Sequence, residues 1–77
     1  NDGIISGISM SSENSNTWDA VIYINGITGP FLSCVNQIKN SSNNFSKSVS
    51  IGDEISLYCL GGNNIDRPRI SVFITNN

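Results

Sequence analysis

The residues of this chain that could do chemistry are few and scattered. The sequence contains no histidine, so the side chain that most often exchanges protons near neutral pH is missing. Its serines have no histidine to activate them and no G-x-S-x-G turn to present one as a nucleophile. Asp53 and Glu54 are adjacent and would point to opposite faces of a strand, which makes them a poor acid–base pair. We therefore expect no catalytic site and a protein that is not an enzyme.

The two cysteines, Cys34 and Cys59, are separated by a long segment. A structural zinc site wants four clustered cysteine or histidine ligands, so we expect no metal site. A small polar domain gains stability from a disulfide, and the strand pattern described below places both cysteines on inward positions. We predict a Cys34–Cys59 disulfide across the core. Two buried free thiols, or a bridge between subunits, are the alternatives.

Oxygen-bearing side chains gather in two polar segments. Asn63, Asn64 and Asp66 could offer oxygen ligands to calcium, but one carboxylate in GGNNIDRP is more typical of ordinary turn chemistry. Asn40 and Asn44 begin N-x-S sequons, which would carry glycans only in a secreted setting. Sequons arise easily by chance in a chain so rich in Asn and Ser. We expect the protein to bind no cofactor.

Length and charge narrow the class of protein. A chain of 77 residues predicts a single domain over 1–77, close to the size at which one core is only just sufficient. Charged residues are 13% of the chain, the net charge is −2 and no basic stripe exists, which argues against nucleic-acid and anionic-membrane partners. Its apolar runs are too short for membrane insertion, and no signal peptide is present. If the protein is secreted, the targeting segment lies outside this sequence.

The elements that would position these side chains are strands. Runs of alternating or β-branched residues predict six of them, over 3–10, 17–24, 30–38, 46–51, 54–60 and 69–75. Turn signals separate the runs, Asn25-Gly26 being a strong one, and the Asn/Ser stretches 13–18 and 39–46 are predicted loops. Helical periodicity is absent. The sequence predicts an all-β fold, a small antiparallel sandwich of about six strands.

Alternation within the strands then assigns their faces. The predicted core is Ile22, Ile24, Leu32, Cys34, Val49, Ile51, Ile55, Leu57, Cys59, Ile70, Val72 and Ile74. The other face carries Tyr23, Tyr58 and Phe73 with Val21, which is more apolar surface than an isolated domain needs. We expect the three aromatic residues near a contact between the subunits of a homo-oligomer. Alternatively, loops such as 39–46 fold over these rings within one subunit.

Three segments, AVIYINGITGPFLSC (20–34), SVSIGDEISLYCLGG (48–62) and RPRISVFITN (67–76), carry a resemblance that covers roughly residues 17 to 75. They resemble the C-terminal halves of jelly-roll domains of the complement and tumour-necrosis-factor type, above all those capping bacterial spore-surface collagen-like glycoproteins and phage fibres. In that family a Gly-Asp corner, here Gly52-Asp53, passes the chain from one sheet to its partner. Local chemistry allows a two-residue hairpin there equally.

A full jelly roll has eight or more strands, which is more than the six predicted here. The resemblance therefore implies either a minimal variant or a neighbouring chain that adds a strand to an open edge.

These patterns favour a structural or adhesive module that self-associates as a fibre head or filament subunit. Such a module would be secreted or lie on the surface of a cell, spore or virion. The alternative is a carbohydrate-binding lectin or toxin-like cell-binding subunit. In that case Trp18, Tyr23 and Tyr58 would stack on a surface glycan, while Asn63 and Asp66 bond its hydroxyls. Packing within the domain is the simpler explanation of the aromatic rings.

Overall fold

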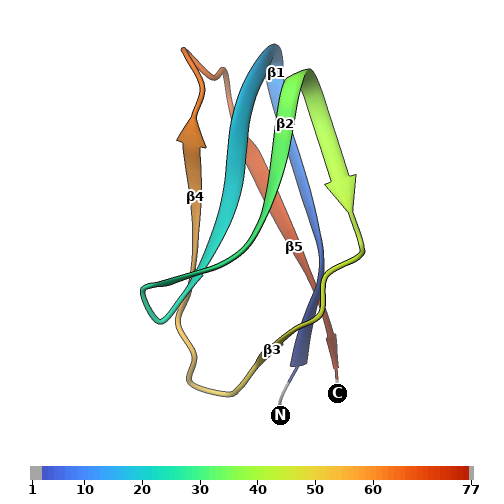
Figure 1. Cartoon of the computed structure of the whole chain (residues 1–77), viewed down its shortest axis with the longest axis vertical. Coiled ribbons are helices and arrows are strands. Elements are labelled where there is room, and N and C mark those ends of the chain that lie inside the picture. Colours follow the sequence, from blue (N-terminus) through green and yellow to red (C-terminus); the bar gives the residue numbers. More distant parts are fainter. Residues whose placement is uncertain (1–2, 77) are drawn as a thin grey trace.

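The computed structural model of the chain describes residues 3–76, which form antiparallel strands and no helix (Figure 1). In chain order the strands are β1 (Gly3–Ile24), β2 (Ile27–Ser42), β3 (Lys47–Val49), β4 (Ile55–Gly61) and β5 (Arg69–Asn76). The all-β prediction is confirmed. Over the described range, no helix has the length and apolar character needed to cross a membrane.

β1 is the central strand, and each of the other strands pairs with it. Its N-terminal half pairs with the end of β2 and with β3 along one side, and with β5 along the other. Its C-terminal half pairs with the start of β2 on one side and with β4 on the other. Hydrogen bonding therefore joins the strands into one five-stranded antiparallel sheet.

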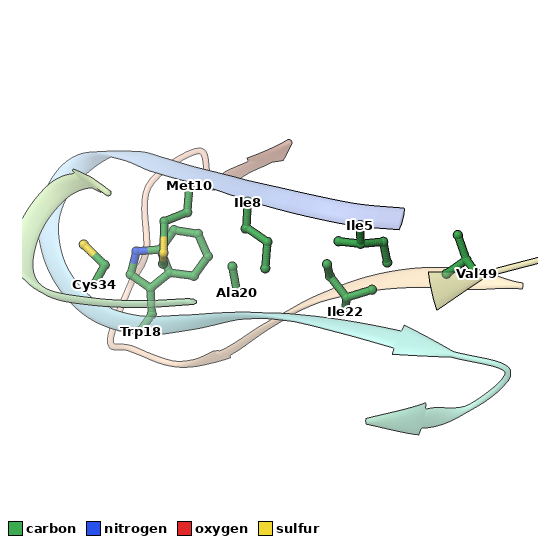
Figure 2. Packing of buried hydrophobic residues seen from close by; sticks show 8 residues of the cluster. All are labelled: Ile5, Ile8, Met10, Trp18, Ala20, Ile22, Cys34 and Val49. Carbon is green, nitrogen blue, oxygen red and sulfur yellow. The ribbon is translucent and has the colours of Figure 1, made fainter. Parts of the chain in front are cut away.

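This sheet folds over because β1 bends near its middle. The pairing of β1 with β2 changes register between Ser11 and Asn16, and again between Asn16 and Trp18. In Figure 1 the blue first half of β1 and its cyan second half run in opposite directions. Figure 2 shows the two halves on either side of the buried side chains. The inward faces of one strand thus build both walls of the core.

Asparagine side chains hold the bend of β1 against the loop between β4 and β5. The Asn14 amide donates to the Asn64 carbonyl at 2.8 Å and accepts the Asp66 N–H at 2.9 Å. In the same way, Asn16 donates to the Asn63 carbonyl at 2.8 Å and accepts the Asn63 N–H at 3.2 Å. A side-chain amide offers the same donor and acceptor groups as a peptide, so it extends the ladder where regular pairing stops.

Both predicted loops contain strand in the structure. The stretch 13–18 lies inside β1, and β2 continues to Ser42 within the stretch 39–46. The predicted strands 3–10 and 17–24 are therefore one strand, which leaves five strands where six were predicted. Short polar side chains carry no apolar periodicity, yet their backbone groups still find ladder partners, and this is why the pattern missed them.

The core lies between the two halves of β1 (Figure 2). The buried cluster consists of Ile5, Ile8, Met10, Trp18, Ala20, Ile22, Cys34 and Val49. All of these except Cys34 and Val49 belong to β1, because the central strand has neighbours on both sides and its own other half above it. Each half shows the period-two burial expected of a strand with one covered face.

The predicted core is right in part. Ile22, Cys34 and Val49 are buried, and Ile24, Leu32, Ile70 and Val72 are half-buried against them. The exposed members are Ile51, Ile55, Leu57, Cys59 and Ile74. Ile51 is 77% exposed because it lies in a turn. The other four have the predicted inward parity, but they lie on β4 and β5, which pair on one side only and are not covered.

The predicted disulfide is wrong, because Cys34 and Cys59 are free thiols. Cys34 pairs with Trp18 on one side of β1, whereas Cys59 pairs with Ala20 on the other side. The two cysteines share a face of the sheet but are separated by a whole strand. That is two strand spacings of about 4.8 Å each, whereas a disulfide needs Cα atoms within about 7 Å.

The Gly52-Asp53 corner connects the two halves of the folded sheet. The Asp53 N–H donates to the Ser50 carbonyl at 3.1 Å, and Gly52 has a φ of 95°, as position i+2 of a type II turn requires. This turn joins β3, which pairs with the start of β1, to β4, which pairs with its end. Within residues 3–76, β3 and β4 do not pair with each other, so the corner is observed and the hairpin is not.

Candidate functional site

Tyr23 and Tyr58 lie together on the outward face of the C-terminal half of β1 and its neighbours. Their rings meet edge to face, with centroids 4.8 Å apart and an interplanar angle of 80°. Val21 pairs with Phe31 of β2 and with Tyr58 of β4, so an apolar row crosses three strands. We call Val21, Tyr23, Phe31, Tyr58 and Leu60 the outer aromatic face.

The outer aromatic face is largely open to solvent. Phe31 is 55% exposed, Tyr58 50% and Leu60 44%. Val21 is buried although it points outward, since it lies between Phe31 and Tyr58 in the same row. Sequence reasoning identified Tyr23 and Tyr58 but missed Phe31 and Leu60. The signal for Phe31 was available, because its neighbour Leu32 was assigned to the core and adjacent residues of a strand face opposite ways.

A shallow hollow of about 300 Å³ lies on this face, lined by Tyr23, Gly26, Ser56, Tyr58 and Leu60. Its chemistry is two phenol rings, one hydroxyl and aliphatic surface. Such a set can stack on or pack against a flat apolar group and offer a few hydrogen bonds. No carboxylate, amine or thiol lines the hollow, and nothing in its lining could activate a nucleophile.

Phe73 is not part of this face. It lies on β5 opposite Gly7, on the outward side of the N-terminal half of the folded sheet, and is 53% exposed. A Cβ atom at Gly7 would lie 3.0 Å from the Phe73 ring and from the Ser42 carbonyl oxygen, so a larger residue would push on both groups and glycine allows the ring to approach β1 closely. The structure therefore places the predicted interface residues on two separate surfaces, Tyr23 with Tyr58 on one and Phe73 on the other.

The residues predicted to bind a glycan are also separated. Trp18 is 2% exposed and lies in the core, so its ring cannot stack on a ligand, and that part of the prediction is wrong. Its indole N–H is buried without a hydrogen-bond partner in the described part of the chain. Asn63 and Asp66 are exposed in the loop between β4 and β5, where the Asn63 backbone and the Asp66 N–H bond the side chains of β1.

Ionisable groups near the start of β4 serve the structure. The Asp53 carboxylate accepts the Ser50 N–H at 2.8 Å and the Asn25 amide at 3.0 Å, and these bonds hold the pKa of Asp53 below its usual value. Asn25 also accepts the Glu54 N–H at 2.9 Å, so hydrogen bonds join the turn at Asn25 to the turn before β4.

The other ionisable groups that the structure describes form no site. Partial desolvation raises the pKa of the Cys59 thiol. Across residues 3–76, no three His, Cys, Asp or Glu side chains are grouped to hold a metal ion.

β4 contributes a second feature beside the outer aromatic face, namely an open strand edge. It pairs with β1 over seven consecutive residue pairs, from Ile24 with Ile55 to Trp18 with Gly61. Among the strands of residues 3–76 it has no other partner. All seven of its residues are exposed, and none is charged or proline.

Comparison with protein-family models, with curated proteins and with solved structures finds no match to this chain.

Proposed function

We propose that this chain is a non-catalytic structural or adhesive module that works by self-association through the outer aromatic face. The observation that carries the proposal is the exposed, contiguous apolar row across β2, β1 and β4. Exposed patches of this kind usually mark an interaction surface, and aromatic residues supply much of the binding energy at interfaces. Burying one such ring contributes about 1.5–3 kcal/mol before the costs of association.

The proposal extends to the setting of the protein. We infer that the folded-over sheet is a minimal variant of a jelly-roll sandwich, and the resemblance of the sequence to the domains that cap spore-surface and phage fibres supports the role of a fibre head or filament subunit. Such a module is secreted or displayed on the surface of a cell, spore or virion. The low charge and the Asn- and Ser-rich surface support this setting without requiring an enzyme, a cofactor or a nucleic acid.

Sedimentation velocity across a wide range of protein concentration tests self-association. We expect the wild-type chain to form a homo-oligomer and Tyr58→Ser to shift it toward the monomer. Ile51→Ser is the control, because Ile51 is 77% exposed but lies in a turn and is not one of the residues of the outer aromatic face. A wild-type chain that remains monomeric at high concentration would contradict the proposal.

Phe73→Ser asks whether the second surface takes part. If Phe73→Ser and Tyr58→Ser each lower the oligomer size, the chain has two contact surfaces on opposite sides of the folded sheet. Two different surfaces that bind each other generate rings or open filaments, whereas one self-complementary surface stops at a dimer.

Glycan binding is the second candidate, and the hollow between Tyr23 and Tyr58 is the observation that favours it. Two phenol rings beside the Ser56 hydroxyl could hold one face of a sugar ring. Titration with simple sugars, followed by the NMR signals of the tyrosine rings, tests this function. Saturable shifts of both rings in a chain that sediments as a monomer would place this candidate first.

A further inference from the structure

The two edges of the folded sheet differ in how well they are protected against pairing with a strand of another chain. The side formed by β2 and β3 contains Pro30 and the lysines Lys39 and Lys47, and its pairing with β1 changes register at three points. Lys47 also lines the hollow beside Ile24 and Ile27, which puts a charge at that opening. Proline, lysine and register irregularities are the usual means by which proteins keep an edge strand from pairing with another chain.

β4, on the opposite side, has none of these features. Its seven residues contain no charge and no proline, and its pairing with β1 runs without a register shift. β5 lies on the same side but begins with Arg69, and its outward face alternates Ser71, Phe73 and Thr75. Of the strands on this side, β4 is therefore the one built to accept a partner.

The backbone of β4 shows which of its groups are available. The Asn25 N–H donates to the Glu54 carbonyl at 2.8 Å just before β4 begins. Bonded and non-bonded pairs alternate along an antiparallel ladder. Since Glu54 bonds to Asn25, the residue that follows β1, the backbone groups of every second residue after Glu54, namely Ser56, Tyr58 and Leu60, face β1. The N–H and C=O groups of the residues between them, Ile55, Leu57 and Cys59, point away from β1 into solvent.

Both faces of β4 are apolar as well. Ile55 and Leu57 point toward the inside of the folded sheet and are 38% and 41% exposed, while Tyr58 and Leu60 point outward and are 50% and 44% exposed. Strands that are apolar on both faces are typical of the interior of a sheet rather than of its edge. β4 thus has the side chains of an internal strand and the free backbone of an edge strand.

We propose that β4 pairs antiparallel with β4 of a second copy about a two-fold axis, so that the sheets of two copies join edge to edge. The proposal rests on the self-association proposed above and names its partner and contact. The free groups of Leu57 and Cys59 must face those of the other copy. Full overlap of Ile55–Gly61 then sets Leu57 opposite Cys59 of the second copy, and Tyr58 opposite Tyr58 at the axis.

A second copy fits this edge better than another partner does. Two-fold pairing needs a self-complementary surface, and a strand with no charges meets its copy without repulsion. It also continues the outer aromatic face, since the row of Phe31, Val21 and Tyr58 meets the same row of the other copy. The mean exposed area is about 64 Å² per residue, from 4942 Å² over 77 residues, so seven residues supply at most about 450 Å² per copy, because edge pairing leaves part of both faces exposed. The total of at most about 900 Å² is at the low end for a specific interface, and we expect a reversible, concentration-dependent dimer.

Leu57→Pro tests the edge directly. The Leu57 N–H makes no bond to β1 in this register, so the only backbone hydrogen bond that proline removes is the one that would reach the second copy, although part of the leucine side chain is lost as well. Ser33→Pro is the control, and it also removes the hydrogen bond that the Ser33 hydroxyl donates to Asp19 at 2.6 Å. Ser33 pairs with Asp19 on the opposite edge of the same half, where its N–H also points away from β1. We expect Leu57→Pro to be a monomer at concentrations where the wild type and Ser33→Pro are dimers, with circular dichroism and Trp18 fluorescence unchanged in both variants.

Cross-linking tests the register independently of proline. In a Cys59→Ser background, Tyr58→Cys places a thiol at the axis, opposite its copy at a Cα distance of about 4.5 Å, which a disulfide can bridge. Ser56→Cys is the control, because it would lie about 13 Å from its copy, four residues along the strand. Because Tyr58→Cys also removes the ring and weakens the association, the oxidation is done at a protein concentration at which sedimentation still shows a dimer of this variant. Mild oxidation should then give a covalent dimer of Tyr58→Cys and not of Ser56→Cys.

The outcomes separate the two proposals. If the wild type is a monomer at every concentration, both the proposed function and the edge pairing fall. If the wild type is a dimer and Leu57→Pro dimerises equally well, or if Ser56→Cys cross-links in place of Tyr58→Cys, the edge pairing is overturned. Self-association through the outer aromatic face would still stand in that case.

Discussion

Ile22 and Leu57 are direct neighbours across the β1–β4 ladder and point to the same inward face of the sheet. They differ in burial, since Ile22 is fully buried and Leu57 is 41% exposed. Changing each to alanine removes a similar amount of side chain from one face of one ladder. The pair therefore measures how much of the inward face is covered in a single copy of the chain.

The expected losses in the free energy of unfolding differ clearly. Replacing a buried isoleucine by alanine costs about 2–5 kcal/mol, because the lost transfer free energy adds to the cost of the cavity. For Leu57 the three carbons removed are worth about 0.8 kcal/mol each when buried, and with 41% of the residue already exposed the loss is about 1–1.5 kcal/mol. No closed cavity forms at an open edge, so no further cost is expected there.

Urea unfolding followed by Trp18 fluorescence measures both losses. Trp18 is the one tryptophan of the chain and is buried in the cluster that contains Ile22, so its emission reports the loss of the core. The protein is kept dilute so that only the single copy is observed. A domain of this length has a total stability of about 4–12 kcal/mol. If Ile22→Ala leaves too little folded protein, Ile22→Val, with a cost of about 0.5–1.5 kcal/mol, replaces it.

Equal losses for the two variants in dilute protein would refute this reasoning. That result would mean that the inward face of β4 is covered within one copy, so that β4 is not an open edge. A loss at Leu57 that grows with protein concentration would instead follow from burial of Leu57 against a second copy.

Two further predictions concern ionisable groups. A thiol reagent should label the exposed Cys59 in the folded chain and the buried Cys34 only after unfolding, giving two thiols per chain. A denatured chain with no free thiol would contradict the free cysteines observed. Because the pKa of Asp53 is lowered in the fold from 3.8, its contribution to stability is present above that pH and is lost as the pH falls through the lower folded value. Wild-type stability should therefore fall more steeply below about pH 4 than that of Asp53→Asn, as denaturant titrations at several pH values would show; parallel curves would contradict the role of Asp53.

Much of the local structure could be predicted from the sequence. Asn25-Gly26 predicts a tight turn, and both residues have positive φ, 54° and 79°, as a type I′ turn requires. The alternation in β4 correctly set Leu57 and Cys59 against Tyr58. These features are local, because a strand turns successive side chains to opposite faces wherever it lies in the molecule.

The candidate site was predictable only in part, because alternation shows the face of a strand on which a side chain lies but not where that strand lies in the molecule. Parity placed Tyr23 and Tyr58 on one outward face, and the structure brings them into contact. It also assigned Phe73 outward, but outward on the other half of a folded sheet is the opposite side of the molecule. Trp18 lies on the parity of Ala20 and Ile22, and extending the alternation back along the strand would have placed it in the core.

The sequence by itself determined that the chain forms strands, where most of those strands lie, the Asn25-Gly26 turn and the alternation of side chains within each strand, because all of these depend on the backbone over a few residues. Only the tertiary structure decided which faces are covered and which strands are neighbours. Cys34 and Cys59 share a face of the sheet but lie on opposite sides of β1. Ile8 and Leu57 both point inward, yet Ile8 is buried and Leu57 is exposed. The bend of β1 makes this difference, since it brings the two halves of one strand together over the core and leaves β4 at the rim.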